Sequence, residues 1–415
     1  MNVRYPGPWP TVAEYDALLM DIARRIQLTK TKHEIAETNF RALCQHVDRE
    51  DGPLANKVIE CYPSGSFATG TAVASRVAKN QHDVDVVIEL DVPPNSTPRD
   101  ILGLLFKAIN GEPGSRYYGK VTQNSRCVTV EYGDGTTVDL MPIARIMGPE
   151  RAGNLFHYKR ETGESRHKLV NPWGFAKHFN DHVDFDPVFH DLFEGRRLLV
   201  EGKIVEKAET QPMPDHVPVE EKSARVVALQ LLKRNRDIAW RSPSRTGRKP
   251  PSVALAAMAL DAGPVHPSLL DEVIAIATYI RTRLQETNGS RGTVCVVNPS
   301  YPPDEFTDRW PENKAAQDLY DGDLRRLIVE LYRLRNEDLS LAEQLELLKR
   351  LFGETAATYA IESKLEAGRR EMDANRMHLT STGKVVGVAA PAVIGSASST
   401  AARAATREGG GELSE

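Results

Sequence analysis

Two aspartates, Asp83 and Asp85, stand one residue apart at the start of the apolar stretch "HDVDVVIEL", His82–Leu90. Residues two apart on a β-strand project from the same face, so this spacing predicts two neighbouring carboxylates above a core formed by the alternate valines. Neighbouring carboxylates raise each other's pKa, and a bound cation removes that repulsion. Because hard divalent cations such as Mg²⁺ prefer oxygen ligands, the pair is a candidate metal site.

A third acid, Asp139, lies in "TTVDLMPI" between the apolar residues Val138 and Leu140. Three carboxylates on adjacent strands would hold two Mg²⁺ ions, which Mn²⁺ could replace. Such a pair of ions can activate an attacking hydroxyl and stabilise a leaving pyrophosphate. The three acids together therefore predict chemistry on a phosphate ester, whereas each alone could be a solvated strand face or a turn cap.

A short glycine loop precedes the acids. Gly65 would let the backbone approach a phosphate closely, and Ser66 would supply a hydroxyl and an N–H group. The loop also fits the G-x-x-x-x-G spacing of a P-loop, but it lacks the lysine that should follow the second glycine. A plain tight turn is the remaining alternative, and the order of glycine loop, paired acids and third acid favours phosphate binding.

The elements that must position these residues are a strand-rich segment flanked by helices. Thr11–Glu14 and Thr31–Glu34 match capping boxes, so we expect a long helix or a helix pair from Thr11 to about Val47. Gly133–Gly135 is a hairpin signal. Apolar patterning predicts a helix at residues 99–110 and strands at residues 58–62, 84–90, 127–132 and 136–143.

The second half of the sequence is helical, with helices expected at residues 223–240, 252–262, 267–286, 321–335 and 341–369. Nine basic residues against two acidic ones lie between Glu221 and Lys249. A basic helix facing an acidic metal site would suit a triphosphate, and a solvated helix face is the alternative. We predict domains at residues 1–205 and 206–375, followed by a disordered tail at 376–415 that is rich in Ala, Ser and Gly.

Composition limits the classes of function. The chain has 415 residues, 40% hydrophobic and 27% charged, and its net charge of −4 argues against broad nucleic-acid binding. No apolar run is long enough to cross a membrane, the first residues lack the apolar core of a signal peptide, and the four cysteines show no C-x-x-C spacing. We therefore expect a cytoplasmic protein with reduced thiols and no membrane contact.

Taken together, "PSGSFATGTAV", "HDVDVVIEL" and "TTVDLMPI" resemble the polymerase-β-like nucleotidyltransferases. More narrowly, the chain resembles the cGAS/DncV-like nucleotidyltransferase (CD-NTase) family of bacterial cyclic-oligonucleotide synthases. The resemblance implies an α+β fold, with a mixed sheet and helices in the core, a C-terminal helical domain and a central cleft. It covers residues 55–355 and extends to four further segments: residues 169–181, 222–237, 249–260 and 296–310.

The resemblance also implies roles for individual residues. Gly65 and Ser66 would bind the triphosphate, with Lys233 as a phosphate contact that Arg234 or Arg236 could replace. Asn171 would shape the nucleotide pocket or form an Asn-Pro turn. Trp173 is expected to pack at the domain junction. Asp83, Asp85 and Asp139 would be the catalytic, metal-binding acids, whereas Asn298, Asp308, Arg309 and Trp310 would be structural.

The implied activity is Mg²⁺-dependent condensation of ATP, GTP or other nucleoside triphosphates into a cyclic di- or trinucleotide, with release of pyrophosphate. In this family the product is a signal in antiphage (CBASS) defence that acts through an effector protein, and an accessory protein could take part. The alternatives are a linear nucleotidyltransferase of the oligoadenylate or CCA type, and a catalytically inactive nucleotide-binding scaffold. The sequence has no Cys/His zinc insertion of the animal DNA sensor, which argues against activation by DNA.

Overall fold

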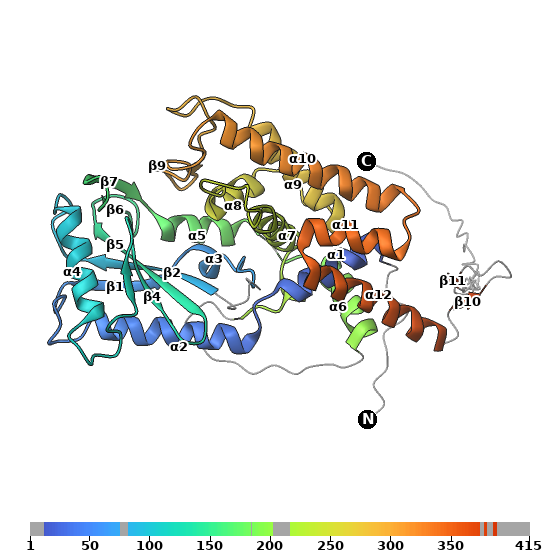
Figure 1. Cartoon of the computed structure of the whole chain (residues 1–415), viewed down its shortest axis with the longest axis horizontal. Helices are drawn as coiled ribbons and strands as arrows, with labels where there is room; N and C mark the ends of the chain where they lie inside the picture. The colour runs from blue at the N-terminus through green and yellow to red at the C-terminus, as the bar shows by residue number, and fades with distance from the viewer. Residues whose placement is uncertain are drawn as a thin grey trace, which may run out of the picture. The chain divides into compact units, whose positions relative to one another are not determined.

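A computed structural model describes residues 12–74, 82–183, 185–201, 216–373, 377–379 and 385–387. The chain forms two compact units, Met1–Ala367 and Gly368–Glu415, and the first contains both the sheet and the helices (Figure 1). The domain boundary expected at residue 205 lies outside the described residues. So does most of the expected tail, of which only the antiparallel strands β10 (Met377–Leu379) and β11 (Val385–Gly387) are described.

The N-terminal segment forms a helix pair, α1 (Glu14–Ile26) and α2 (Lys30–Val47). The N-cap of α2 is Thr29, two residues before the expected cap, because its side chain accepts a hydrogen bond from the Lys32 N–H. The Thr31–Glu34 segment therefore lies within the helix and is not its capping box. Helix α1 has Ala13 at its N-cap and no side-chain cap there, and Thr11 lies outside the described residues.

A mixed sheet forms the core of the N-terminal half, in the order β1-β2-β5-β4-β3, with β6 pairing β5 and β7 pairing β6. Strands β2 and β5 are parallel, and the other pairs are antiparallel. The strands are β1 (Val58–Pro63), β2 (His82–Leu90), β3 (Val121–Gln123), β4 (Val128–Glu131), β5 (Thr136–Arg145), β6 (Gly153–Lys159) and β7 (Glu164–Val170). The four expected strands and the hairpin between β4 and β5 are confirmed.

The two faces of the sheet differ. One face carries Val84, Val86 and Leu140 into a core that α2 and α4 (Pro98–Asn110) cover, as Figure 1 shows. The alternation of β2 turns its two aspartates to the opposite face, where the short helix α3 (Gly65–Ala68) packs against the strand. The valines therefore anchor the strand while the acids remain accessible.

The second half of the first unit is a bundle of helices. The predicted helix at 341–369 is divided by Gly353, which adopts a φ of +88° that L-residues avoid. Strands β8 (Val297–Asn298) and β9 (Tyr301–Glu305) form a small hairpin that the sequence did not predict. The helices are α5 (Pro172–Asp181), α6 (Pro187–Glu201), α7 (Ala224–Ala239), α8 (Ser252–Leu260), α9 (Leu269–Arg283), α10 (Lys314–Asn336), α11 (Leu341–Phe352) and α12 (Glu354–Asp373), with a 3₁₀ turn at Val219–Glu221.

Helix α7 occupies the centre of the bundle, and every residue from Ala224 to Arg236 is buried. A solvated basic face is therefore excluded. Its buried cations are compensated, as in the ion pair between the Arg225 Nε and the Glu272 carboxylate at 2.6 Å. Among the described residues, no helix combines the length and apolar character needed to span a membrane.

Candidate active site

A cavity of about 820 Å³ lies between the sheet and the helices of the first unit. The glycine loop, the three acids and the middle of α7 all contribute to its wall. Among the described residues, its basic side chains outnumber its acidic ones, which favours an anionic ligand that also carries a cation. The charged lining consists of Arg126, Lys168, Lys233, Arg234, Arg236, Arg241, Lys249 and Arg309 together with Asp83, Asp85, Asp139, Asp237 and Asp304.

The three acids meet through the register of two parallel strands. Asp85 lies directly opposite Asp139, and Asp83 lies opposite Thr137. The hydroxyl of Thr137 donates a hydrogen bond to Asp83, and the hydroxyl of Thr129 donates one to Asp139. The structure thus places the expected acids side by side on one face.

The carboxylates of the site repel one another. The pKa of the Asp85 carboxyl is raised to about 7, first because protein atoms crowd out its water and then because Asp139 and Asp83 carry like charge. Burial also raises the pKa of Asp139, against the stabilising hydrogen bond from Thr129. A bound cation would therefore stabilise the site by relieving the repulsion between its carboxylates.

Whether the site suits a divalent ion depends on which side-chain atoms could bind it. As the side chains lie, no three acidic, imidazole or thiol groups of the described residues converge on one point that could hold a metal. Asp83, Asp85 and Asp139 nevertheless offer only oxygen donors, they border the same cavity, and their backbone positions are adjacent. These properties suit Mg²⁺, since Asp83 and Asp139 could exchange their threonine donors for the ion.

The glycine loop packs directly on the acids. Gly65 has a φ of +58°, and a Cβ placed on it would lie 2.2 Å from an oxygen of Asp85. The backbone N–H of Ser64 donates to the Asp85 carbonyl at 2.8 Å. No residue with a side chain fits at position 65 in this arrangement, so the glycine is required both by its backbone and by its neighbour.

Lys233 joins helix α7 to the same loop. Its Nζ donates to the Thr71 carbonyl at 2.7 Å and to the Thr71 hydroxyl at 3.2 Å. The hydroxyls of Thr71 and Thr69 are 2.9 Å apart, and that of Thr69 donates to the Gly65 carbonyl. Burial lowers the pKa of Lys233 to about 7, with a further contribution from Arg236, against the attraction of nearby carboxylates. The structure therefore brings Lys233 together with Gly65 and Ser66.

The two arginines considered as substitutes for Lys233 also border the cavity, but structural contacts hold them. Arg234 donates from its Nε to the Phe352 carbonyl at 2.9 Å, and Arg236 donates to the Pro250 carbonyl at 2.8 Å. Both therefore tie α7 to the chain around it, which leaves Lys233 as the stronger candidate for a phosphate contact.

Asn171 does not border this cavity, and its expected role in shaping the nucleotide pocket stays a prediction. The residue is buried at the N-cap of α5, where its side chain accepts from the Gly174 N–H at 2.8 Å and donates to the Glu150 carbonyl at 3.2 Å. This geometry is that of the Asn-Pro turn named as the alternative. Trp173 packs against the sheet, with the Arg151 guanidinium 4.1 Å from the centre of its ring, and its expected place at the domain junction stays a prediction.

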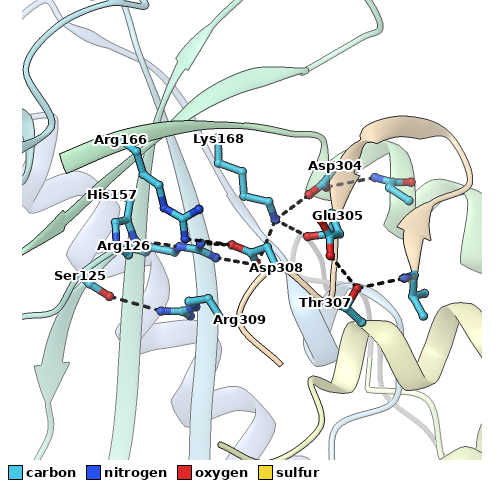
Figure 2. A network of polar contacts seen from close by, with 12 residues as sticks. Ser125, Arg126, His157, Arg166, Lys168, Asp304, Glu305, Thr307, Asp308 and Arg309 are labelled. Carbon is cyan, nitrogen blue, oxygen red and sulfur yellow. Dashed lines mark hydrogen bonds and ion pairs between the residues drawn. The ribbon is translucent and has the colours of Figure 1, made fainter. Parts of the chain in front are cut away.

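Sequence reasoning missed a second end of the cavity, which is built from the segment just before β4, from β7, and from β9 with the segment after it (Figure 2). Asp308 accepts from Arg126, and the Lys168 Nζ lies 3.1 Å from Asp304. Asp308 therefore forms ion pairs with residues of the sheet, and the structural role expected for Trp310 agrees with its buried packing against Tyr320. Arg309, which was expected to be structural, instead borders the cavity.

Comparison with known proteins identifies the family. Residues 14–181 match the Second Messenger Oligonucleotide or Dinucleotide Synthetase (SMODS) domain. The chain is 32% identical over 407 residues to the cyclic dinucleotide synthase CdnG of Bradyrhizobium diazoefficiens, with 96% of each chain covered. The chain belongs to the cGAS/DncV-like nucleotidyltransferase family. It is therefore a nucleotidyltransferase of the cyclic-oligonucleotide synthase type, as the motifs predicted.

Solved structures agree on the fold. The structure of B. diazoefficiens CdnG in complex with GTP matches with a TM-score of 0.72 and 29% identity, covering 85% of this chain and 99% of that one. Escherichia coli CdnC with ATP matches with a TM-score of 0.51 at 18% identity, covering 81% and 96%. The 3′-deoxy-ATP form of Vibrio cholerae DncV matches with 0.51 at 15%, covering 84% and 87%. The expected fold class is confirmed.

Proposed function

We propose that this protein condenses two nucleoside triphosphates, or three, into a cyclic oligonucleotide and releases pyrophosphate at each bond. The observation that carries this proposal is the direct pairing of Asp85 with Asp139, with Gly65 packed against Asp85. This arrangement supports the proposal because the backbone of the glycine loop lies directly beside the carboxylates. Relatives bound to GTP and ATP support nucleoside triphosphates as the substrates.

The donor triphosphate would lie over the glycine loop. The first N–H groups of a helix have no partner within it, so Gly65 and Ser66 at the start of α3 can donate to phosphate oxygens. Lys233 would add a cation from the opposite wall, since the loop already holds its Nζ beside Thr71. Asp83, Asp85 and Asp139 would hold Mg²⁺, which when bound would neutralise charge on the phosphates and lower the pKa of the attacking hydroxyl.

In the first step, a ribose hydroxyl oxygen of the acceptor attacks the α-phosphorus of the donor. The bond between that phosphorus and the oxygen leading to the β-phosphate breaks, and pyrophosphate leaves with its electron pair. Asp139 takes the hydroxyl proton, because it lies on the side of the acid group that faces β4 and the second end of the cavity. The linear product then turns over in the cavity, and its free hydroxyl attacks its own 5′ triphosphate in the same way.

The leading alternative is a linear transferase, which would use the same acids for one step. A nucleotide-binding scaffold without catalysis is the other. The match to CdnG along nearly the whole chain favours the cyclase over both, because it includes the helical half that distinguishes cyclases from linear enzymes.

The test is to incubate the protein with Mg²⁺ and the four α-³²P-labelled triphosphates, treat the mixture with phosphatase, and separate the products. A cyclic product keeps its label, whereas a linear product loses its terminal phosphates and runs as a different species. We expect a resistant product from the wild type and from Asp91→Asn, an exposed acid just beyond β2, and none from Asp85→Asn. A linear product, or no product from a wild type that binds nucleotide, contradicts the proposal.

We further infer that the product is a signal in antiphage defence that acts through an effector protein, with an accessory protein as a second partner. Membership of the family supports this inference. Replacing the chromosomal gene with the Asp139→Asn variant should abolish protection against phage while leaving the protein level unchanged. Full protection in that strain would contradict the inference and leave the enzymatic proposal intact.

A further inference from the structure

Arg309 is the exception among the cations at the second end of the cavity. Its guanidinium is half-buried, and within the described part of the chain its only hydrogen bond reaches the Ser125 hydroxyl at 3.3 Å. Arg126, by contrast, makes two hydrogen bonds to Asp308, and Lys168 lies 3.1 Å from Asp304 (Figure 2). Arg309 thus faces the cavity with most of its donors available.

The charges around Arg309 leave room for an anion. Asp308 is the acid that attracts Arg309, but that carboxylate already pairs with Arg126, with Arg166 at 3.6 Å and with Lys168 at 3.7 Å. Burial lowers the pKa of Arg309 to about 10, and Arg126 and Arg248 add to this by repulsion. An anionic ligand would relieve this repulsion, whereas a neutral base edge would not.

The position of Arg309 relates it to the acceptor side of the site. Ser125 precedes β4 by three residues, and Thr129 on β4 lies opposite Asp139. Ser125 lies in the tight turn that leads into β4, which the Asn124 N–H closes by donating to the Cys127 carbonyl at 2.9 Å. Arg309, bound to Ser125, and Asp139 border the same cavity. The glycine loop and Lys233 border Asp85 on its other side. A nucleotide whose ribose hydroxyl reaches Asp139 would therefore extend its own phosphates toward Arg309.

We propose that Arg309 binds the 5′ phosphates of the acceptor nucleotide and so forms a second phosphate subsite in the cavity. This inference rests on the proposed function and makes it more specific. Arg309 would hold the acceptor with its ribose hydroxyl toward the donor, whose triphosphate occupies the glycine loop.

The test separates donor from acceptor by chemistry. Labelled 2′,3′-dideoxy-GTP can act only as donor, because it lacks both ribose hydroxyls, and the acceptor is either GTP or guanosine, which has no phosphates. The measured quantity is the KM of each acceptor in the reaction that forms labelled dinucleotide. Arg309→Gln should raise the KM of GTP roughly ten- to hundredfold while leaving that of guanosine unchanged, since only phosphates lose a charged hydrogen bond. Arg309→Lys should retain part of the preference for GTP.

A matched control and the contrary outcomes complete the design. Arg291→Gln removes a nearby guanidinium that donates to the Asp308 and Thr307 carbonyls and does not line the cavity. This variant should leave the KM ratio unchanged. Equal increases for GTP and guanosine in Arg309→Gln would indicate base recognition or a structural role and overturn the proposal, as would no change in either. If the wild type forms no dinucleotide from a dideoxynucleoside triphosphate donor and a nucleoside triphosphate acceptor with any of the four bases, the proposed function itself fails. The wild type alone shows that outcome.

Discussion

The two ends of the cavity differ in how they are built. The acidic end consists of Asp83, Asp85 and Asp139 on paired strands, where residues of one sign lie together and repel one another. The second end joins the segment before β4, strand β7 and the segment after β9 through ion pairs such as Arg126–Asp308. The acidic end therefore gathers like charges that only a bound ligand would neutralise. The second end balances its own charges, and its ion pairs also connect the sheet to the helical half.

The largest effect is expected at the acidic end. Asp139→Asn should lower the rate of dinucleotide formation roughly 10²–10⁴-fold, because the proton acceptor and a metal ligand are lost. The free energy of unfolding should stay the same or rise, because one of three like charges is removed. Asp91→Asn is the control, and rate measurements with thermal unfolding check both quantities. A stability loss that parallels the loss of rate would remove the distinction between the two ends.

The glycine loop offers a sharper version of the same contrast. Gly65 and Gly70 have similar φ values, +58° and +63°, but a Cβ would clash only at Gly65, since nothing lies within 4 Å at Gly70. An alanine at either site should reduce stability by about 1–2 kcal/mol. Only Gly65→Ala should also lose activity, because its Cβ displaces Asp85. Equal activity of the two variants would show that the contact between loop and acid is unimportant.

Lys233 tests the connection from helix α7 to the loop. Lys233→Met should raise the KM of the donor triphosphate roughly ten- to hundredfold, because a buried charged hydrogen bond to phosphate is lost. Lys222→Met is the matched control, since Lys222 is bound to the Gln27 side chain and does not line this cavity. Steady-state kinetics measures the difference, and an equal KM for both variants contradicts the assignment.

The smallest effect is expected at Asn171, which caps α5. Asn171→Ala should lower the free energy of unfolding by about 1 kcal/mol, as loss of an N-cap does, while the KM values stay the same. Thr29→Ala removes the corresponding cap of α2 and gives a reference for the size of the loss. Denaturant unfolding provides the comparison. A raised KM in Asn171→Ala alone would return this residue to the nucleotide site.

The same contrast explains what the sequence could predict. The acids follow from the period of two in a strand, and Val84 and Val86 mark which face is buried. The glycine loop lies shortly before β2 in the sequence, so the loop and the paired acids can be recognised together as one motif. Local patterning thus predicted strands β1, β2, β4 and β5, the hairpin between β4 and β5, and the acidic end of the site.

The second end could not be predicted in this way. Arg126, Lys168 and Arg309 lie far apart in the sequence and meet only through tertiary packing, so no spacing relates them. The charge of α7 predicted a basic helix facing the acids but not which of its cations reach the cavity, because every residue from Ala224 to Arg236 is buried and several are held by structural contacts. Asn171 was ambiguous because an asparagine before proline suits both a pocket and a helix cap.

The central claim is that the paired acids and the glycine loop form an active site that closes a ring of nucleotides. Mass spectrometry of the product made by wild type with Mg²⁺ and nucleoside triphosphates tests it most directly. The account predicts a species lighter by one water than the corresponding linear oligonucleotide with one 5′ phosphate, and its absence with Asp85→Asn. A wild-type product that retains a 5′ triphosphate and a free ribose end, with no cyclic species at any time, would contradict it.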